Sequence, residues 1–212
     1  MIKEFCAENF TQIPLAIENG ANRIELCDNL SVGGTTPSYG VIKNTIEYCK
    51  DYSVPIMTMI RPRGGDFEYS IQEGIIMEND IEQAIELGTD GVVLGCLTSE
   101  NKIDRVLMET LLKKCKHVEV TFHMAFDEIA KEDQFNEMEW LIHHHVTRIL
   151  THGGSAGDIF RHQDRLNELI SHAKGRIEIL PGGGVTYENL TELAGKINAN
   201  QFHGTKIVDY SS

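Results

Sequence analysis

The fold is decided by a phrase that occurs twice in the chain: ENGANRIE at residues 18–25 and ELGTDGV at residues 86–92. Each phrase joins the end of a helical segment to a glycine, a short bridge and the start of a β-branched run. Glycine suits the left-handed residue that follows a helix. A helix that returns the chain to a sheet in this way is the crossover between two parallel strands. The repeat therefore predicts a parallel α/β sheet.

The same alternation runs through the whole chain. We expect eight strands, at residues 2–7, 23–28, 55–61, 91–97, 118–126, 148–152, 176–180 and 201–208. Between them we expect seven helices, at residues 11–19, 39–51, 72–87, 104–114, 134–144, 158–173 and 187–195. This order favours a TIM-type (β/α)8 barrel, with an open doubly wound sheet as the alternative. No linker or compositional break interrupts residues 1–212, so we expect a single domain.

Only four residues, 209–212, follow the last predicted strand, so the barrel should lack a full eighth helix. The apolar flank that this helix would cover needs another occupant, either a second subunit or a rearranged earlier helix. We therefore predict a homodimer.

Composition excludes several classes of protein. Lys and Arg total 19 against 32 Asp and Glu, a net charge of −13, which argues against binding nucleic acid or anionic lipid. No run approaches the ~18 apolar residues of a membrane span. The charged N-terminus does not resemble a signal peptide, and the five cysteines are scattered. These features predict a cytoplasmic protein with reduced thiols.

Strand periodicity places polar groups inside the barrel, because successive side chains of a strand point to opposite faces. Ile24 and Leu26 would face the helices, which leaves Glu25 and Cys27 inside. The same reasoning places further polar side chains inside at Glu4, Cys6, Glu119 and Glu178. Buried acids need partners, so we expect either a salt-bridge network or a deep site, with Arg61 as the expected counter-charge.

The loops after the strands carry candidate anion ligands. Arg61 and Arg63 follow the third strand, where they could converge on one phosphate or carboxylate, or could neutralise the interior acids. A glycine cluster and a histidine near the last two strand ends could bring backbone amides to an anion: Gly182, Gly183, Gly184 and His203. Glycines are also plain turn residues.

Two further sets suggest chemistry. His123 and Asp127, at the end of the fifth strand, could act as an acid–base pair or bind a metal, with Glu25 as a further proton carrier. Cys6 and Cys27 could supply two soft thiolates to Cu(I), whereas zinc would require two more ligands. Buried cysteine is also often only a small hydrophobic residue.

The ordered motifs of the chain resemble those of the CutC copper-homeostasis family. They are RIELC at 23–27, GGTTPS at 33–38, MIRPRGGDF at 59–67, GTDGVV at 88–93, TFHMAFD at 121–127, RILT at 148–151, PGGGV at 181–185 and FHG at 202–204. The resemblance implies a TIM-type barrel, a cytoplasmic location and copper handling, with Cu(I) held by Cys6 and Cys27. The chain departs from the family pattern at Met124, where arginine is expected, and at His152, where serine is more usual.

Two functional hypotheses follow. In the first, the protein binds Cu(I) through Cys6 and Cys27. In the second, it is an enzyme acting on a small anionic or phosphorylated substrate at the barrel mouth. Arg61 and Arg63 would then hold the anion, His123 and Glu25 would exchange protons, and the glycine loops would seat the phosphate.

Overall fold

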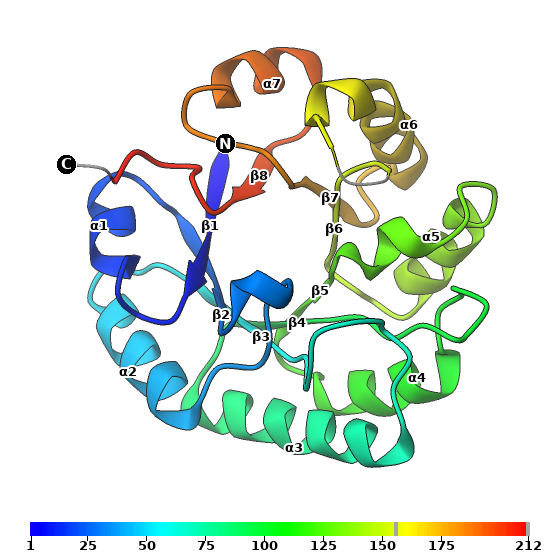
Figure 1. Cartoon of the computed structure of the whole chain (residues 1–212), viewed down its shortest axis with the longest axis horizontal. Helices are drawn as coiled ribbons and strands as arrows, with labels where there is room; N and C mark the ends of the chain where they lie inside the picture. Colours follow the sequence, from blue (N-terminus) through cyan, green and yellow to red (C-terminus); the bar gives the residue numbers. More distant parts are fainter. Residues whose placement is uncertain (155–156, 211–212) are drawn as a thin grey trace.

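A ring of eight parallel strands forms the centre of the molecule in the computed structural model, which describes residues 1–154 and 157–210 (Figure 1). The sheet order is β7-β6-β5-β4-β3-β2-β1-β8. The strands are β1 (Ile2–Glu8), β2 (Arg23–Cys27), β3 (Ile56–Met59), β4 (Gly91–Leu94), β5 (Glu119–Phe122), β6 (Arg148–Thr151), β7 (Glu178–Pro181) and β8 (Gln201–Gly204). The edge strands β7 and β8 are joined by a side-chain hydrogen bond from Gln201 Nε2 to Glu178 Oε2 at 3.1 Å. The barrel is therefore nearly closed, as predicted.

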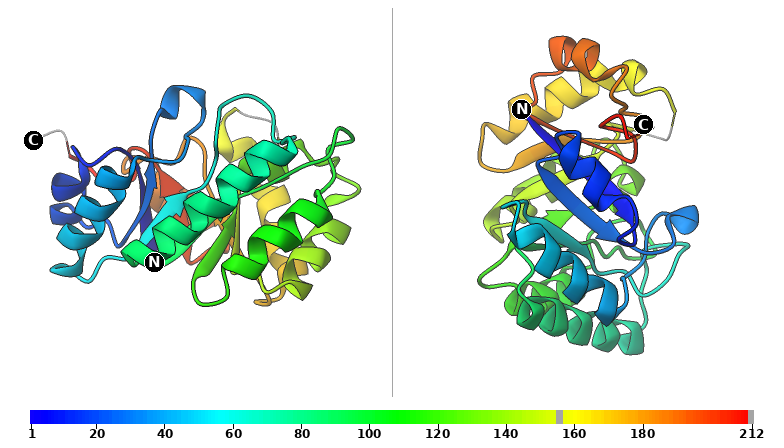
Figure 2. Two further views of the ribbon diagram at one scale, coloured as in Figure 1. Left: turned by 90° about the horizontal axis from the view of Figure 1, so that it is seen from below. Right: turned by 90° about the vertical axis from the view of Figure 1, so that its left-hand side faces the viewer.

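In the described residues seven α-helices surround the ring, and three short 3₁₀ segments lie in the loops. The α-helices are α1 (Ile13–Glu18), α2 (Tyr39–Lys50), α3 (Ile71–Leu87), α4 (Arg105–Lys114), α5 (Gln134–His143), α6 (Gln163–Ala173) and α7 (Leu190–Lys196). The 3₁₀ segments are η1 (Leu30–Val32), η2 (Met124–Glu128) and η3 (Ile159–His162). Figure 2 shows η1 standing beyond the carboxyl ends of the strands, at the end of the barrel opposite the N-terminus. This segment partly covers the barrel mouth.

Local sequence explains where the elements begin and end. Ser70 and Glu73 form a reciprocal capping box at the start of α3, which satisfies two backbone donors. The fifth strand is shorter than predicted, because the ring of His123 accepts a hydrogen bond from the Ala125 amide and starts η2. That early end turns the His123 side chain toward the barrel mouth.

The described segment after β8 covers part of the flank that an eighth helix would cover. Residues 205–210 contain no helix, and Tyr210 packs edge-on against Phe5 of β1 with ring centroids 5.4 Å apart. Some of the open flank is thus covered by the chain itself, and the homodimer stays a prediction. No helix in the described part of the chain is long and apolar enough to span a membrane.

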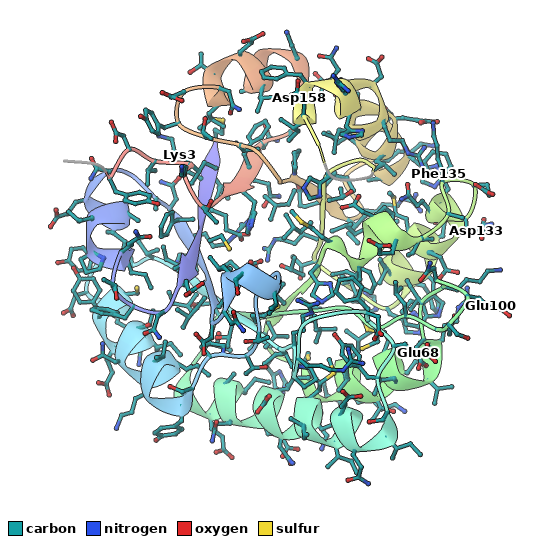
Figure 3. All side chains as sticks on the ribbon, in the orientation of Figure 1. Lys3, Glu68, Glu100, Asp133, Phe135 and Asp158 are labelled. Carbon is teal, nitrogen blue, oxygen red and sulfur yellow. The ribbon has the colours of Figure 1, made fainter. Side chains whose placement is uncertain are left out.

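The strands bury different side chains on their two faces. The helix-facing positions form the main apolar core, which includes Phe5, Ile24, Leu26 and Phe122. A smaller apolar cluster consists of Cys6, Cys27, Met57, Met59 and Val93. This separation confirms the predicted alternation for the first two strands. Side chains occupy the interior of the ring, as Figure 3 shows.

Two arginines neutralise acids at the amino ends of the strands. Arg23 bonds to Glu4 through Nε, while Arg148 bonds to Glu119 and also contacts Thr121 Oγ1 at 3.1 Å. The prediction that Arg61 supplies the counter-charge was wrong, because Arg61 lies at the opposite end of the barrel and bonds to loop carbonyls. The barrel floor is therefore a layer of ion pairs, and the mouth lies above it.

Candidate functional site

The centre of the candidate site is a buried cluster on β1 and β2. The parallel register places Cys6 beside Glu25. The sulfur of Cys6 lies 3.4 Å from Glu25 Oε1, and the sulfur of Cys27 lies 3.5 Å from the same oxygen. One atom from each of the three residues lies within 4.8 Å of the other two. The predicted thiol pair is thus brought together, with a carboxyl group between the sulfurs.

His203 of β8 joins this cluster from the other side of β1. Its Nδ1 lies 2.8 Å from Glu4 Oε1, and its Nε2 lies 3.9 Å from Glu25 Oε1. Burial would raise the pKa of Glu4, but the hydrogen bond from His203 and the charge of Arg23 lower it to about 2. The Glu4 carboxylate therefore holds the imidazole in a fixed orientation beside the thiols.

The two thiols differ in proton affinity. A hydrogen bond from Cys27 lowers the pKa of Cys6 to about 5 despite burial, and His203 assists. The pKa of Cys27 is raised well above its ordinary value by the hydrogen bond to Cys6 and by burial. Burial also raises the pKa of Glu25 well above its usual range. Within the cluster Cys6 is therefore the thiol that loses its proton first, and Glu25 holds its proton more tightly than an exposed carboxyl does.

A cavity of about 200 Å³ extends from this cluster to the opposite wall of the barrel. Its lining includes Cys6, Glu25, Leu30, Gly33, Met59, Arg61, Phe67, His123, Met124, Leu150, His203 and Thr205. On the far wall the Phe67 ring contacts both Arg61, whose guanidinium is 4.8 Å from the ring centroid, and His123, whose ring centroid is 4.9 Å away. Burial and the charge of Arg61 lower the pKa of His123 to about 3, so its imidazole is neutral.

The structure does not bring Arg61 and Arg63 together around one anion. Arg61 donates to the carbonyl oxygens of Val32 and Gly34 through one terminal nitrogen, at 2.8 and 3.0 Å. Its other terminal nitrogen donates to the carbonyl of a neighbouring loop residue, Gly65, at 2.7 Å. Arg63 instead pairs with Glu73 and Asp66 at the rim. Both arginines brace the loops around the mouth.

Asp127 does not pair with His123, contrary to the predicted acid–base pair. Its carboxylate accepts hydrogen bonds from Thr151 Oγ1 and from the backbone amide of His152 at 2.9 Å. The same oxygen lies 3.3 Å from His152 Nδ1. The strand that ends at Thr151 lies next to β5, so Asp127 reaches sideways to the neighbouring loop. The His/Asp pair of this structure is His152 and Asp127.

The glycine cluster lies beside a second cavity of about 350 Å³, whose lining includes Gly183, Gly184, His203 and Lys206. A Cβ on Gly182 would lie 2.6 Å from Leu150 Cδ1. A Cβ on Gly183 would lie 1.7 Å from His152 Nε2. These two glycines therefore make room for neighbouring side chains, and anion binding by the cluster stays a prediction.

Sequence reasoning missed Arg23 and Gln201, which complete the buried network. Arg23 donates to Gln201 Oε1 at 2.6 Å and to Glu4. The signal was available, because Arg23 shares its parity with Glu25 and Cys27 on one predicted strand. Gln201 likewise shares its parity with His203.

These features define a TIM barrel with a buried thiol, carboxyl and imidazole cluster at its mouth. The model of the CutC family matches residues 1–208. A family protein CutC from Enterococcus faecalis is 54% identical over 98% of this chain and 100% of its own length. The human relative, named copper homeostasis protein cutC homolog, is 40% identical over 95% of this chain and 72% of its own. The chain belongs to the CutC family.

Solved structures agree with this assignment. The crystal structure of CutC from Streptococcus agalactiae superposes with a TM-score of 0.95 at 46% identity, over 98% of this chain and 100% of that one. An aldolase, QR15, superposes with a TM-score of 0.72 at 12% identity, over 99% of this chain and 92% of its own. The second likeness shows the shared barrel fold alone.

Proposed function

We propose that this protein binds one Cu(I) ion through Cys6 and Cys27 and takes part in cellular copper homeostasis. The carrying observation is the approach of two buried sulfurs and the Glu25 carboxyl to within 4.8 Å of one another. Soft thiolate ligands favour Cu(I), which accepts low coordination numbers. The name of the human relative supports the physiological role.

The protonation and burial of the two sulfurs suit the binding of a Cu(I) ion. The Cys6 thiolate provides one ligand directly, and Cys27 would release its proton when the metal binds. Both sulfurs are buried, so the protein would shield the ion from water and oxidants. All five cysteines of the described chain are free thiols. This supports our further proposal of a reducing, cytoplasmic location.

Anaerobic titration of Cu(I) against a competing chelator tests the proposal. The parent protein should bind one equivalent, and Cys6→Ala or Cys27→Ala should abolish this binding while circular dichroism shows an intact barrel. Cys49→Ala, which removes a buried thiol of α2, is the matched control and should bind one equivalent. Unchanged binding by the Cys6→Ala/Cys27→Ala double variant would refute the proposed ligands.

A further inference from the structure

The thiols of Cys6 and Cys27 are buried in the barrel interior, so a metal ion needs a way in. Cys6 is 6% exposed and Cys27 is 0% exposed. The floor of ion pairs lies toward the amino ends of the strands, and entry from that end would break buried pairs such as Arg23 with Glu4. The surrounding helices cover the sides of the ring. The route to the sulfurs therefore leads through the mouth.

Residues 29–34, which include η1, cover the thiols on the mouth side. Leu30 packs against the apolar cluster that contains both cysteines, and it lines the mouth cavity together with Gly33. A Cβ on Gly34 would lie 3.1 Å from the sulfur of Cys27, so the backbone passes close to this thiol. Figure 2 shows the segment, in blue, standing beyond the strand ends. Moving it would open the site from outside.

The backbone of this segment suits a movement as one unit. Asn29 has φ 47°, and at the other end Gly33 and Gly34 have φ 89° and 87°. Glycine adopts positive and negative φ almost equally well, so these two positions can rotate at low cost. Two backbone hydrogen bonds between Asp28 and Thr35, at 2.9 and 2.7 Å, hold the base together. The segment can therefore swing about a fixed base.

The contacts that hold the segment over the mouth come mainly from the loop after β3. Arg61 Nη1 donates to the carbonyl oxygens of Val32 and Gly34 at 2.8 and 3.0 Å. Val32 also lies against Gly64, where an added Cβ would be 2.6 Å from the Val32 Cβ. Val32 is 40% exposed, so this contact lies at the rim. The segment is held by a few contacts and not by a packed core.

We propose that residues 29–34 form a lid that swings away from the mouth to admit a metal ion to the buried thiols, with Arg61 as its latch. Opening breaks the two hydrogen bonds from Arg61 and one from the Leu30 amide to Glu8 Oε2 at 2.7 Å. Water can replace these bonds at the rim. The identity of the ion rests on the proposed function, but the lid controls access for any reagent and is tested without copper.

Alkylation of the native protein by iodoacetamide, a small uncharged reagent, tests the lid. The whole chain is reduced, freed of reductant and treated at urea concentrations below the unfolding transition, while mass spectrometry follows the initial rate at each cysteine. Lid opening exposes little surface, so the rate at Cys27 should change little with urea. Cys49, a buried thiol of α2 in the main core, is the internal control. Its rate should rise steeply with urea, because exposing it requires unfolding.

Two variants loosen the lid by different means. Arg61→Met removes both latch hydrogen bonds and should speed alkylation of Cys27 about 10-fold or more. Gly64→Ala leaves every charge in place and pushes Val32 away from the rim, so it should speed the same reaction about 10-fold or more. A variant that only lowers global stability would speed Cys27 and Cys49 together. The rate at Cys27 relative to Cys49 therefore reports the lid.

Two substitutions away from the mouth are the matched controls. Arg176→Met removes an arginine that also donates to backbone carbonyls, but before β7 at the amino end of the barrel. Gly195→Ala adds a Cβ that would meet nothing within 4 Å. Both controls should keep the parent ratio of the two rates.

Uptake of Cu(I) from a chelator complex then tests what the lid admits. Arg61→Met and Gly64→Ala should take up Cu(I) faster than the parent, by about the factor that alkylation shows. A parent that binds no Cu(I) would refute the proposed function and leave the alkylation results standing.

Three alkylation results would overturn the lid. One is a shared urea dependence of Cys27 and Cys49 in the parent, because the thiol would then be reached only by unfolding. Another is a parent ratio of the two rates in both Arg61→Met and Gly64→Ala. The third is an equal rise of this ratio in the control variants.

Discussion

The buried neutral imidazole of His123 should make the protein less stable in mild acid. The native pKa of His123 is about 3, against an ordinary value of 6.5, because of burial and the charge of Arg61. Between these two values the unfolded chain binds a proton at this position and the folded chain does not. Stability rises with pH wherever the unfolded state binds more protons, so His123 lowers the free energy of unfolding as pH falls below 6.5.

The size of this effect follows from the same difference. One pH unit corresponds to about 1.4 kcal/mol for one proton. When the pH is lowered from 7.5 to 5.0, the last 1.5 units or so lie below the pKa of the unfolded histidine. Over this range His123 should lower the free energy of unfolding by about 2 kcal/mol. Glu4 does not contribute here, since its pKa of about 2 makes its stabilisation fall away between pH 4.5 and 2.

His123→Asn isolates the effect, because it removes the titrating ring and keeps an acceptor for the Ala125 amide. Urea unfolding of parent and variant should be measured at pH 7.5, 6.5 and 5.0. The stability of the parent relative to the variant should fall by about 2 kcal/mol from the highest to the lowest pH. The exposed His117, changed to Asn, is the matched control for losing one imidazole.

Parallel stability curves for parent and His123→Asn would refute the reasoning. They would mean that the native imidazole accepts a proton as easily as the unfolded one. The hydrogen bond from the Ala125 amide would then fail as well, because a doubly protonated ring could not accept it.

Two other substitutions test the interior contacts. Arg23→Met leaves the buried Glu4 carboxylate without its cation and should destabilise the protein by about 3 to 5 kcal/mol in urea unfolding. Adding Glu4→Gln should recover part of this loss, and no recovery would contradict the pairing. Gly183→Ala forces a Cβ into the space of the His152 ring at φ +81° and should lower stability by about 1 to 3 kcal/mol. Adding His152→Ala should restore part of the lost stability, measured by thermal unfolding. If the double variant is no more stable than Gly183→Ala alone, the whole loss comes from the strained backbone of Gly183 and none from the clash with His152.

Periodicity predicted which face of each strand carries polar groups, because it depends only on local geometry. The spacing of Glu25 and Cys27 fixes one side of β2 whatever surrounds it. Alternation of strands and helices fixed the parallel barrel for a similar reason. These features require no knowledge of which strands become neighbours.

The partners of the polar groups could not be predicted in this way. Glu4 meets His203 only because the barrel closes β1 onto β8, residues separated by 199 positions. Asp127 turned to His152 rather than His123 because β5 ended early and its last loop ran beside β6. Arg61 bonds to loop carbonyls and Arg63 pairs with acids at the rim, and the alternation of residues along a strand does not predict these partners. Pairing depends on closure and loop paths, which sequence periodicity does not contain.

The ion pairs at the barrel floor explain why the candidate site lies at the other end of the interior. Arg23 and Arg148 already bond to the acids around them, so they cannot serve a ligand without leaving a buried carboxylate alone. One residue pair higher, Glu25 Oε2 and His123 Nε2 have no hydrogen-bond partner among the residues that the structure describes. The charges of the floor pair with one another, whereas these two groups above it do not, so the cavity between Cys6 and His123 is a favourable place for a ligand.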